Sequence, residues 1–348
     1  MLSHQKVGDV LRAQGATADA LAEYRTSLAI AEALAITAPT SNRERDVAVG
    51  HQKIGDVLLA QHDSAAALVE YRAELAISEA LAAKDPGNAD WQRDFSVSHE
   101  RLGDVLVAQH DGSGALVEYQ ASLGIAVALA AKDPTNADRH RDLSVSYNKV
   151  GDVLRAAGDA PGALADYRAS LAIREKLAAK DPTNTDRQRD LGVSHERIGN
   201  MLRARHDLAG ALAEYRASLE IDELLAAKDP TNADRQRDLA VSQTKVGNGL
   251  GANPEALVHY QSALAIFTAL AAKNPANLER QADCADGHDR VGDALLARGD
   301  QAGALAEYQA GLAIARALVA GEPGTAAWSK RVAALTGKLA SCGRATKP

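Results

Sequence analysis

One pattern recurs along almost the whole chain: a glycine followed by aspartate or asparagine, then a tyrosine and a proline at fixed distances. The glycines stand at steps of 47, 48, 48, 48, 48 and 45 residues: Gly8, Gly55, Gly103, Gly151, Gly199, Gly247 and Gly292. A period of about 20–50 residues indicates units that bury a core only by stacking on their neighbours. We therefore expect seven repeats, at about 1–39, 40–86, 87–134, 135–182, 183–230, 231–275 and 276–323, followed by a capping helix at 324–341 and a tail at 342–348.

Each repeat has the pattern of two helices. In the fourth repeat Leu143, Tyr147, Val150 and Leu154 follow at spacings of four, three and four residues, which places them on one helix face. We expect Thr135 to cap this helix with Asp138 as its reciprocal partner. Aromatic residues make up only 3% of the chain, which disfavours a sheet protein. The sequence therefore predicts an all-α fold.

The glycine lies inside the first helix of each repeat, where it costs about 1 kcal/mol relative to alanine. An alanine follows twelve residues later in six repeats, and nine residues later, as Ala256, in the sixth. The tyrosine comes four residues after the alanine. We expect the glycine and the alanine to face each other, so that the two helix backbones approach closely and the tyrosine fills the space beside that contact.

Paired helices with this glycine, alanine, aromatic residue and closing proline resemble the tetratricopeptide repeat. The family's unit has 34 residues, and each helix here is expected to be about two turns longer. The resemblance implies a right-handed α-solenoid of seven helix-turn-helix repeats with a C-terminal capping helix. It also implies a scaffold that binds a protein or peptide on the concave face, which the first helices line.

The resemblance places three positions of each first helix on that face: three residues before the glycine, one after it and four after it. In the third to fifth repeats these candidate partner-binding residues are Glu100, Asp104, Val107, Asn148, Asp152, Arg155, Glu196, Asn200 and Arg203. A lysine or arginine always stands two residues before the glycine, and we expect it to pair with the aspartate or asparagine three residues later in its own repeat. Two interpretations stay open: a row of solvated ion pairs, or a polar groove for an extended peptide.

No pattern in the sequence indicates a catalytic, cofactor or metal site. Five repeats carry a histidine four residues before the glycine, but equivalent residues of stacked helices lie roughly 10 Å apart, whereas zinc needs ligands at about 2.0–2.3 Å. We expect these histidines to pack, partly buried. The segment Asp133–Asp138 lacks the glycine and glutamate of a calcium loop. Cys284 and Cys342 lack a paired histidine pattern, and we predict no enzyme and no cofactor.

The charge and composition of the chain argue against some classes of partner. The net charge of -7 argues against nucleic acid and against an anionic membrane surface. No apolar run approaches the ~20 residues of a membrane span, and no signal peptide is evident. Two cysteines give no disulfide framework. These features favour a cytoplasmic protein without a membrane partner.

Two irregularities keep other functions open. The sixth repeat is short and glycine-rich around Gly249, with Asn253 as the expected cap of its second helix, so we expect a kink or hinge there. The chain starts halfway along a first helix, at Leu2. The array is therefore also compatible with a sensor or regulatory region of a larger signalling protein or enzyme, or with a structural protein that self-associates end to end.

Overall fold

The computed structural model describes residues 1–344, and this part of the chain folds into helices without any strand. The helices are α1 (Leu2–Ala13), α2 (Thr17–Thr37), α3 (Ser41–Ala60), α4 (Ser64–Lys84), α5 (Ala89–Ala108), α6 (Gly112–Lys132), α7 (Ala137–Ala156), α8 (Ala160–Lys180), α9 (Thr185–Ala204), α10 (Leu208–Lys228), α11 (Ala233–Leu250), α12 (Glu255–Lys273), α13 (Leu278–Ala297), α14 (Gln301–Gly321) and α15 (Ala326–Arg344). Residues 345–348, at the end of the predicted tail, lie outside the described part. The predicted all-α class is confirmed.

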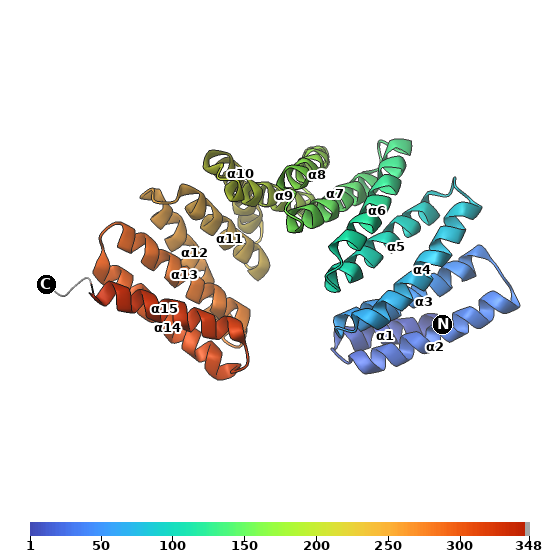
Figure 1. Ribbon diagram of the computed structural model, residues 1–348, viewed down its shortest axis with the longest axis horizontal. Helices are drawn as coiled ribbons and strands as arrows, with labels where there is room; N and C mark the ends of the chain where they lie inside the picture. The colour runs from blue at the N-terminus through green and yellow to red at the C-terminus, as the bar shows by residue number, and fades with distance from the viewer. Residues whose placement is uncertain (345–348) are drawn as a thin grey trace. The chain divides into compact units, whose positions relative to one another are not determined.

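The chain divides into two compact units, residues 1–177 and 178–348. In the first unit each helix from α1 to α7 packs against the next one along the chain, as Figure 1 shows. In the second unit α9 to α15 pack in the same way, and α15 covers α14. We call the odd-numbered helices α1 to α13 the first helices and the even-numbered helices α2 to α14 the second helices of the repeats.

Polar caps set where the helices begin. The second helices follow an aspartate whose carboxylate accepts a backbone N–H three residues on, at Asp63, Asp111, Asp159, Asp207 and Asp300. The residue before the cap has a left-handed backbone, which glycine adopts in the fourth and seventh repeats and also in the first, where the cap is Ala16. In the other regular repeats a histidine takes this conformation, with φ of 62–63° at His62, His110 and His206.

The first-helix cap differs from the expected one. Asn136, not Thr135, is the N-cap of α7, and its side chain accepts the N–H groups of Asp138 and Arg139 at 3.1 Å each. The Thr135 hydroxyl instead donates to Asp133 at 2.9 Å. The sequence offers two cap-forming residues in a row, and the second one is used because its carbonyl oxygen reaches two backbone donors.

The short sixth repeat ends its first helix early, as expected, at Leu250. A side chain on Gly249 would lie 3.2 Å from both Leu212 and Tyr215 of α10, so this glycine allows close packing. Gly251 ends the helix with a φ of 58°. The N-cap of α12 is Pro254 and not the expected Asn253, although the Asn253 side chain accepts the N–H of Glu255, the first residue of the helix. Packing and turn geometry thus account for the glycines, and a hinge at this place stays a prediction.

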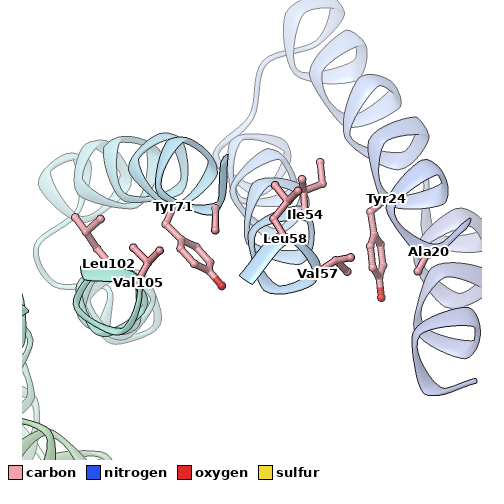
Figure 2. Packing of buried hydrophobic residues seen from close by; sticks show 9 residues of the cluster. Ala20, Tyr24, Ile54, Val57, Leu58, Tyr71, Leu102 and Val105 are labelled. Carbon is pink, nitrogen blue, oxygen red and sulfur yellow. The ribbon is translucent and has the colours of Figure 1, made fainter. Parts of the chain in front are cut away.

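The core lies in the joints between consecutive helices. Figure 2 shows one part of it, where Tyr24 of α2 and Tyr71 of α4 are each flanked by aliphatic side chains of the first helices. Ile54 and Val57 of α3 are 1% and 0% exposed, and Val105 of α5 is also 0% exposed. Each joint therefore buries apolar surface that a single repeat would leave in water.

Among the described helices, α6 is long and apolar enough to cross a membrane by length and composition alone. The expectation that no apolar run approaches a span is therefore wrong for this helix, because its valine, leucine, isoleucine and alanine residues outweigh its few polar ones. In the structure α6 packs between α5 and α7, and its Tyr119 and Ser122 are buried.

Candidate interaction surface

The recurring glycine makes room for the tyrosine ring of its own repeat. A side chain on Gly55 would lie 2.7 Å from the ring of Tyr71, and the same ring contact recurs in all seven repeats. At Gly151 the added carbon would also lie 3.3 Å from the carbonyl oxygen of Ala163. The predicted close approach at the small residues is confirmed, but the tyrosine lies on the glycine itself and not beside it.

Each tyrosine hydroxyl donates to the residue that follows the glycine. The seven donor–acceptor pairs, at 2.6–3.0 Å, are Tyr24–Asp9, Tyr71–Asp56, Tyr119–Asp104, Tyr167–Asp152, Tyr215–Asn200, Tyr260–Asn248 and Tyr308–Asp293. The aspartate or asparagine therefore orients the ring that fills the space above the glycine. This role explains why the position always carries a short acceptor.

The cation two residues before the glycine pairs across the joint, not within its repeat. Lys53 reaches Asp9 of the preceding repeat at 2.8 Å, and Lys149 reaches Asp104 at 2.5 Å. Lys245 and Arg290 reach Asn200 and Asn248 in the same way, and Lys338 of α15, which precedes no such glycine, reaches Asp293. The predicted intra-repeat pair is wrong, because the acceptor three residues on is already occupied by its tyrosine and by the next repeat's cation.

A second set of contacts between repeats was not anticipated. Arg93 of α5 binds both carboxylate oxygens of Asp142 on α7, at 2.6 and 3.2 Å. The same bidentate contact joins Arg45 to Asp94, Arg189 to Asp238 and Arg237 to Asp283. The Arg-Asp dipeptide that recurs in the first helices is the sequence pattern that could have predicted these contacts. Such bidentate pairs fix the orientation of one first helix against the next.

The histidines of the first helices are partly buried, as expected, and each pairs with a glutamate on the second helix of its repeat. The Nδ1–Oε2 distances are 2.6–2.7 Å for His4–Glu23, His51–Glu70, His99–Glu118, His195–Glu214 and His288–Glu307. In the sixth repeat the histidine is on the second helix instead: Nδ1 of His259 on α12 is hydrogen-bonded to Oε1 of Gln243 on α11. Among residues 1–344 no group of three His, Cys, Asp or Glu side chains is placed to hold a metal ion.

Cys284 does have a histidine partner, contrary to the expectation from its surroundings in the sequence. Burial raises the pKa of its thiol, but hydrogen bonds with His288 and Thr268 outweigh burial and bring the pKa below its ordinary value. The residue is only 3% exposed and packs with Phe267. The thiol therefore lies buried inside the joint between two repeats.

The predicted site residues differ in their accessibility. Val107, Arg155 and Arg203, all four residues after the glycine, are exposed. Glu100, Asp104, Asp152, Glu196 and Asn200 are partly buried. Asn148 is buried, and its side-chain oxygen has no hydrogen-bond partner among the described residues. The exposed row is thus the one that lies four residues after the glycine.

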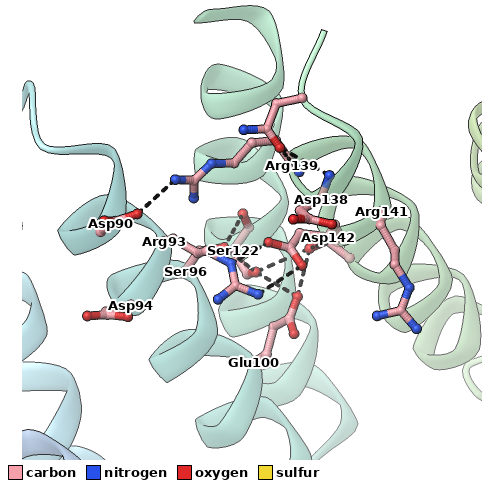
Figure 3. A network of polar contacts seen from close by, with 12 residues as sticks. Asp90, Arg93, Asp94, Ser96, Glu100, Ser122, Asp138, Arg139, Arg141 and Asp142 are labelled. Atoms are coloured by element: carbon pink, nitrogen blue, oxygen red, sulfur yellow. Dashed lines mark hydrogen bonds and ion pairs between the residues drawn. The ribbon is translucent and has the colours of Figure 1, made fainter. Parts of the chain in front are cut away.

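Glu100 belongs to a polar network between α5, α6 and α7, which Figure 3 shows. Its carboxylate accepts the hydroxyls of Ser146 at 2.7 Å and Ser122 at 3.1 Å. Burial raises the pKa of this carboxyl above its ordinary value. The network borders a cleft of about 210 Å³, whose walls include Arg93, Glu100 and Leu129. Glu100 therefore supports the joint between two repeats more than it meets solvent.

A wider depression of about 460 Å³ opens on the first helices of the second and third repeats. It is lined by Asp56, Leu59, Ala60, Tyr71, Arg101 and Asp104. These residues include the positions one and four after the glycine, which were the predicted binding positions. The contributions of Tyr71 and Arg101 were missed, because neither the ring's position nor the pairing between repeats can be read from spacing along one helix.

Comparison with known proteins agrees with this architecture. Residues 143–182 match the tetratricopeptide repeat family. No protein with curated annotation matches the chain in sequence. The apo form of RapI is 14% identical, with 90% of this chain and 97% of RapI covered and a TM-score of 0.55.

Two further solved structures are similar. A hypoxic regulator of sterol synthesis described as a nuclear import adaptor is 14% identical, with 90% of this chain and 98% of that chain covered and a TM-score of 0.53. A signal transduction ATPase with numerous domains and a tetratricopeptide repeat sensor, from Pyrococcus horikoshii, is 10% identical, with 85% of this chain and 39% of that chain covered and a TM-score of 0.59. At these identities the likeness shows the fold alone.

Proposed function

We propose that this chain, whose residues 143–182 match the tetratricopeptide repeat family, is a scaffold that binds a protein or peptide on the face of its first helices. One observation carries the proposal: along this face the residues that hold the stack are constant, whereas the residue four after the glycine changes, and it is exposed at Arg12, Val107 and Arg155 and partly buried at Leu59. In the first unit this position is Arg12, Leu59, Val107 and Arg155 in turn. A stack needs no such variation, but recognition of an extended partner does, because each repeat meets a different part of it.

The exposed first-helix side chains combine apolar and charged chemistry. Leu59 borders the depression of about 460 Å³, and Val107 is 46% exposed on the next first helix. The carboxylates of Asp56 and Asp104 border the same depression. A preformed surface of this kind supports binding without a large ordering cost, since the helices are already held by their joints.

The test compares substitutions of exposed residues on the first helices with a matched substitution on a second helix. The partner is first captured with the intact chain by cross-linking, and binding is then measured for Val107→Asp on α5, Arg155→Glu on α7 and Val117→Asp on α6. Val117 is 64% exposed on a second helix, so its variant is the matched control. We expect the Val107 and Arg155 variants to lose the partner and the control to keep it. Binding that survives both first-helix changes would contradict the proposal.

A second function is supported by the likeness to the signal transduction ATPase, whose tetratricopeptide repeats are its sensor. In that case the array is the regulatory part of a larger assembly, and the same first-helix face binds the signal. Arg203→Glu in the second unit then changes the response of the effector, measured as its activity with and without the partner. An effector that responds equally with wild type and with this variant would argue against the sensor role.

A further inference from the structure

We propose that the depression beside Asp56 binds a lysine or arginine side chain of the partner. This inference rests on the proposed function and names the chemistry of the ligand at one place on the same face. It begins from a difference between otherwise equivalent joints: at this joint alone the residue three after the tyrosine is a glutamate, Glu74, whereas the other repeats have Ser27, Ser122, Ser170, Ser218, Ala263 and Gly311.

Arg101, the cation that would otherwise pair with Asp56, pairs with Glu74 instead. Nη1 of Arg101 lies 2.8 Å from Oε1 of Glu74, while Nε of Arg101 lies 4.0 Å from Oδ1 of Asp56. The corresponding distances at the flanking joints are 2.8 Å for Lys53–Asp9 and 2.5 Å for Lys149–Asp104. Asp56 is therefore the least neutralised of these three carboxylates.

When it is ionised, the buried Glu74 carboxylate holds Arg101. Glu74 is only 4% exposed and also accepts the Ser98 hydroxyl at 3.1 Å. Its second oxygen has no hydrogen-bond partner among the described residues. An ionised carboxylate in this place needs the nearby guanidinium, because an uncompensated buried charge is strongly unfavourable. In this state Arg101 pairs with Glu74, and its charge does not balance Asp56.

Asp56 keeps only weak or neutral contacts of its own. Its Oδ1 accepts the Tyr71 hydroxyl at 2.8 Å, and its Oδ2 accepts the Gln52 side chain at 3.4 Å. The side chain is 28% exposed, so a partner group can reach it. The remaining negative charge thus faces the depression, in a protein whose net charge is -7.

The shape of the depression fits a long basic side chain. Leu59 and Ala60 give it an apolar wall next to the Asp56 carboxylate. Lysine and arginine carry a flexible aliphatic stem that packs on apolar surface and a charged head that seeks a carboxylate. Asp104, at the other side, has Lys149 at 2.5 Å from its Oδ1, so Asp56 is the carboxylate of this depression without a close cation.

The experiment uses the intact chain with labelled leucine and valine methyl groups and two tripeptide probes, at a pH high enough to keep Glu74 ionised. One is acetyl-Ala-Arg-Ala-amide, and the other carries citrulline, which has the shape of arginine without its charge. We expect the arginine probe to shift the Leu59 methyl resonances and to bind about fivefold more tightly than the citrulline probe, the factor that corresponds to ~1 kcal/mol for a partly exposed ion pair.

Three variants separate the proposed contact from general charge attraction. Asp56→Asn should lower the affinity for the arginine probe about fivefold, and Glu74→Ser, which frees Arg101 to approach Asp56, should lower it about threefold. Asp9→Asn is the matched control, since Asp9 has the same register but a close lysine, and it should leave the affinity unchanged. Equal affinity for both probes, or unchanged binding in Asp56→Asn, would overturn the inference.

This outcome can be told apart from failure of the proposed function. If the arginine probe does not bind at Leu59 while Val107→Asp still loses the captured partner, only the present inference is wrong. If the partner also survives every first-helix substitution, the proposed function fails as well.

Discussion

Replacing Gly55 by alanine tests the packing rule that holds each repeat together. Alanine favours a helix over glycine by about 1 kcal/mol, so propensity alone predicts a more stable protein. The structure predicts the opposite, because the new methyl group would lie 2.7–3.0 Å from three ring atoms of Tyr71. Tyr71 is 2% exposed and its ring is not at the end of a flexible chain, so it cannot move aside without disturbing the joint.

The expected size of the effect follows from the contacts that would be disturbed. Overpacking of a core costs about 1–3 kcal/mol. A displaced ring also weakens the hydrogen bond from the Tyr71 hydroxyl to Asp56, now 2.8 Å long, and bonds to charged groups contribute about 1.5–3 kcal/mol. After subtracting the propensity gain, we expect Gly55→Ala to lower the free energy of unfolding of this repeat by about 2–4 kcal/mol.

The matched control is Gly124→Ala on α6. Gly124 is exposed and an added side chain would meet nothing within 4 Å, so only the propensity gain of about 1 kcal/mol applies. Because repeat arrays do not always unfold in one step, the assay is native-state hydrogen exchange read separately for α3–α4 and α6. A loss of 2 kcal/mol speeds exchange about 30-fold. Equal or slower exchange in α3–α4 of Gly55→Ala would refute the packing argument.

Four further substitutions test the caps, the buried carboxylate and the contacts between repeats. Asn136→Ala should destabilise α7 by about 1 kcal/mol in urea unfolding, and Thr135→Ala by clearly less; equal losses would show that both residues cap. Burial raises the pKa of Glu74 to about 7 from 4.5, so the folded state binds a proton that the unfolded state releases, and wild-type stability should fall by about 3 kcal/mol as the pH rises through this window. Glu74→Gln should lose that slope when unfolding is measured at pH values below and above the window. Lys149→Met removes the exposed contact with Asp104 and should cost about 0.5–1 kcal/mol at low salt and less at high salt; a loss that ignores salt would mean that the aliphatic stem, not the charge, matters.

Much of the fold could be predicted from the sequence, because seven similar repeats report the same structure independently. The helical spacing in residues such as Leu143 and Val150 predicted both helices of a repeat. The small residues predicted where the helices approach. What the repeats could not show is which of two adjacent capping residues is used: Thr135 and Asn136 are both good caps, and only the backbone path decides between them.

The site was less predictable, because its contacts join residues that are far apart in the sequence. A lysine three residues before an aspartate suggests a pair along one helix. In the stack Lys149 pairs with Asp104, 45 residues earlier, and the packing of one repeat on the next that brings them together leaves no trace in local spacing. Glu74 stood out as an exception in the sequence, but its effect on Asp56 depends on where Arg101 lies in space.

The cation that pairs backward across several joints also affects how such an array can change in length. At the joints of the first and second, third and fourth, fifth and sixth, and sixth and seventh repeats, a repeat supplies a carboxylate or amide to the cation of its successor, so each repeat carries one half of the contact. Duplication or deletion of whole repeats then regenerates a complete contact at the new boundary. A deletion or insertion that ends inside a repeat, for example between Asp104 and Tyr119, separates residues that contact each other within that repeat. The array can therefore grow or shrink only in whole repeats without losing the fit of its joints.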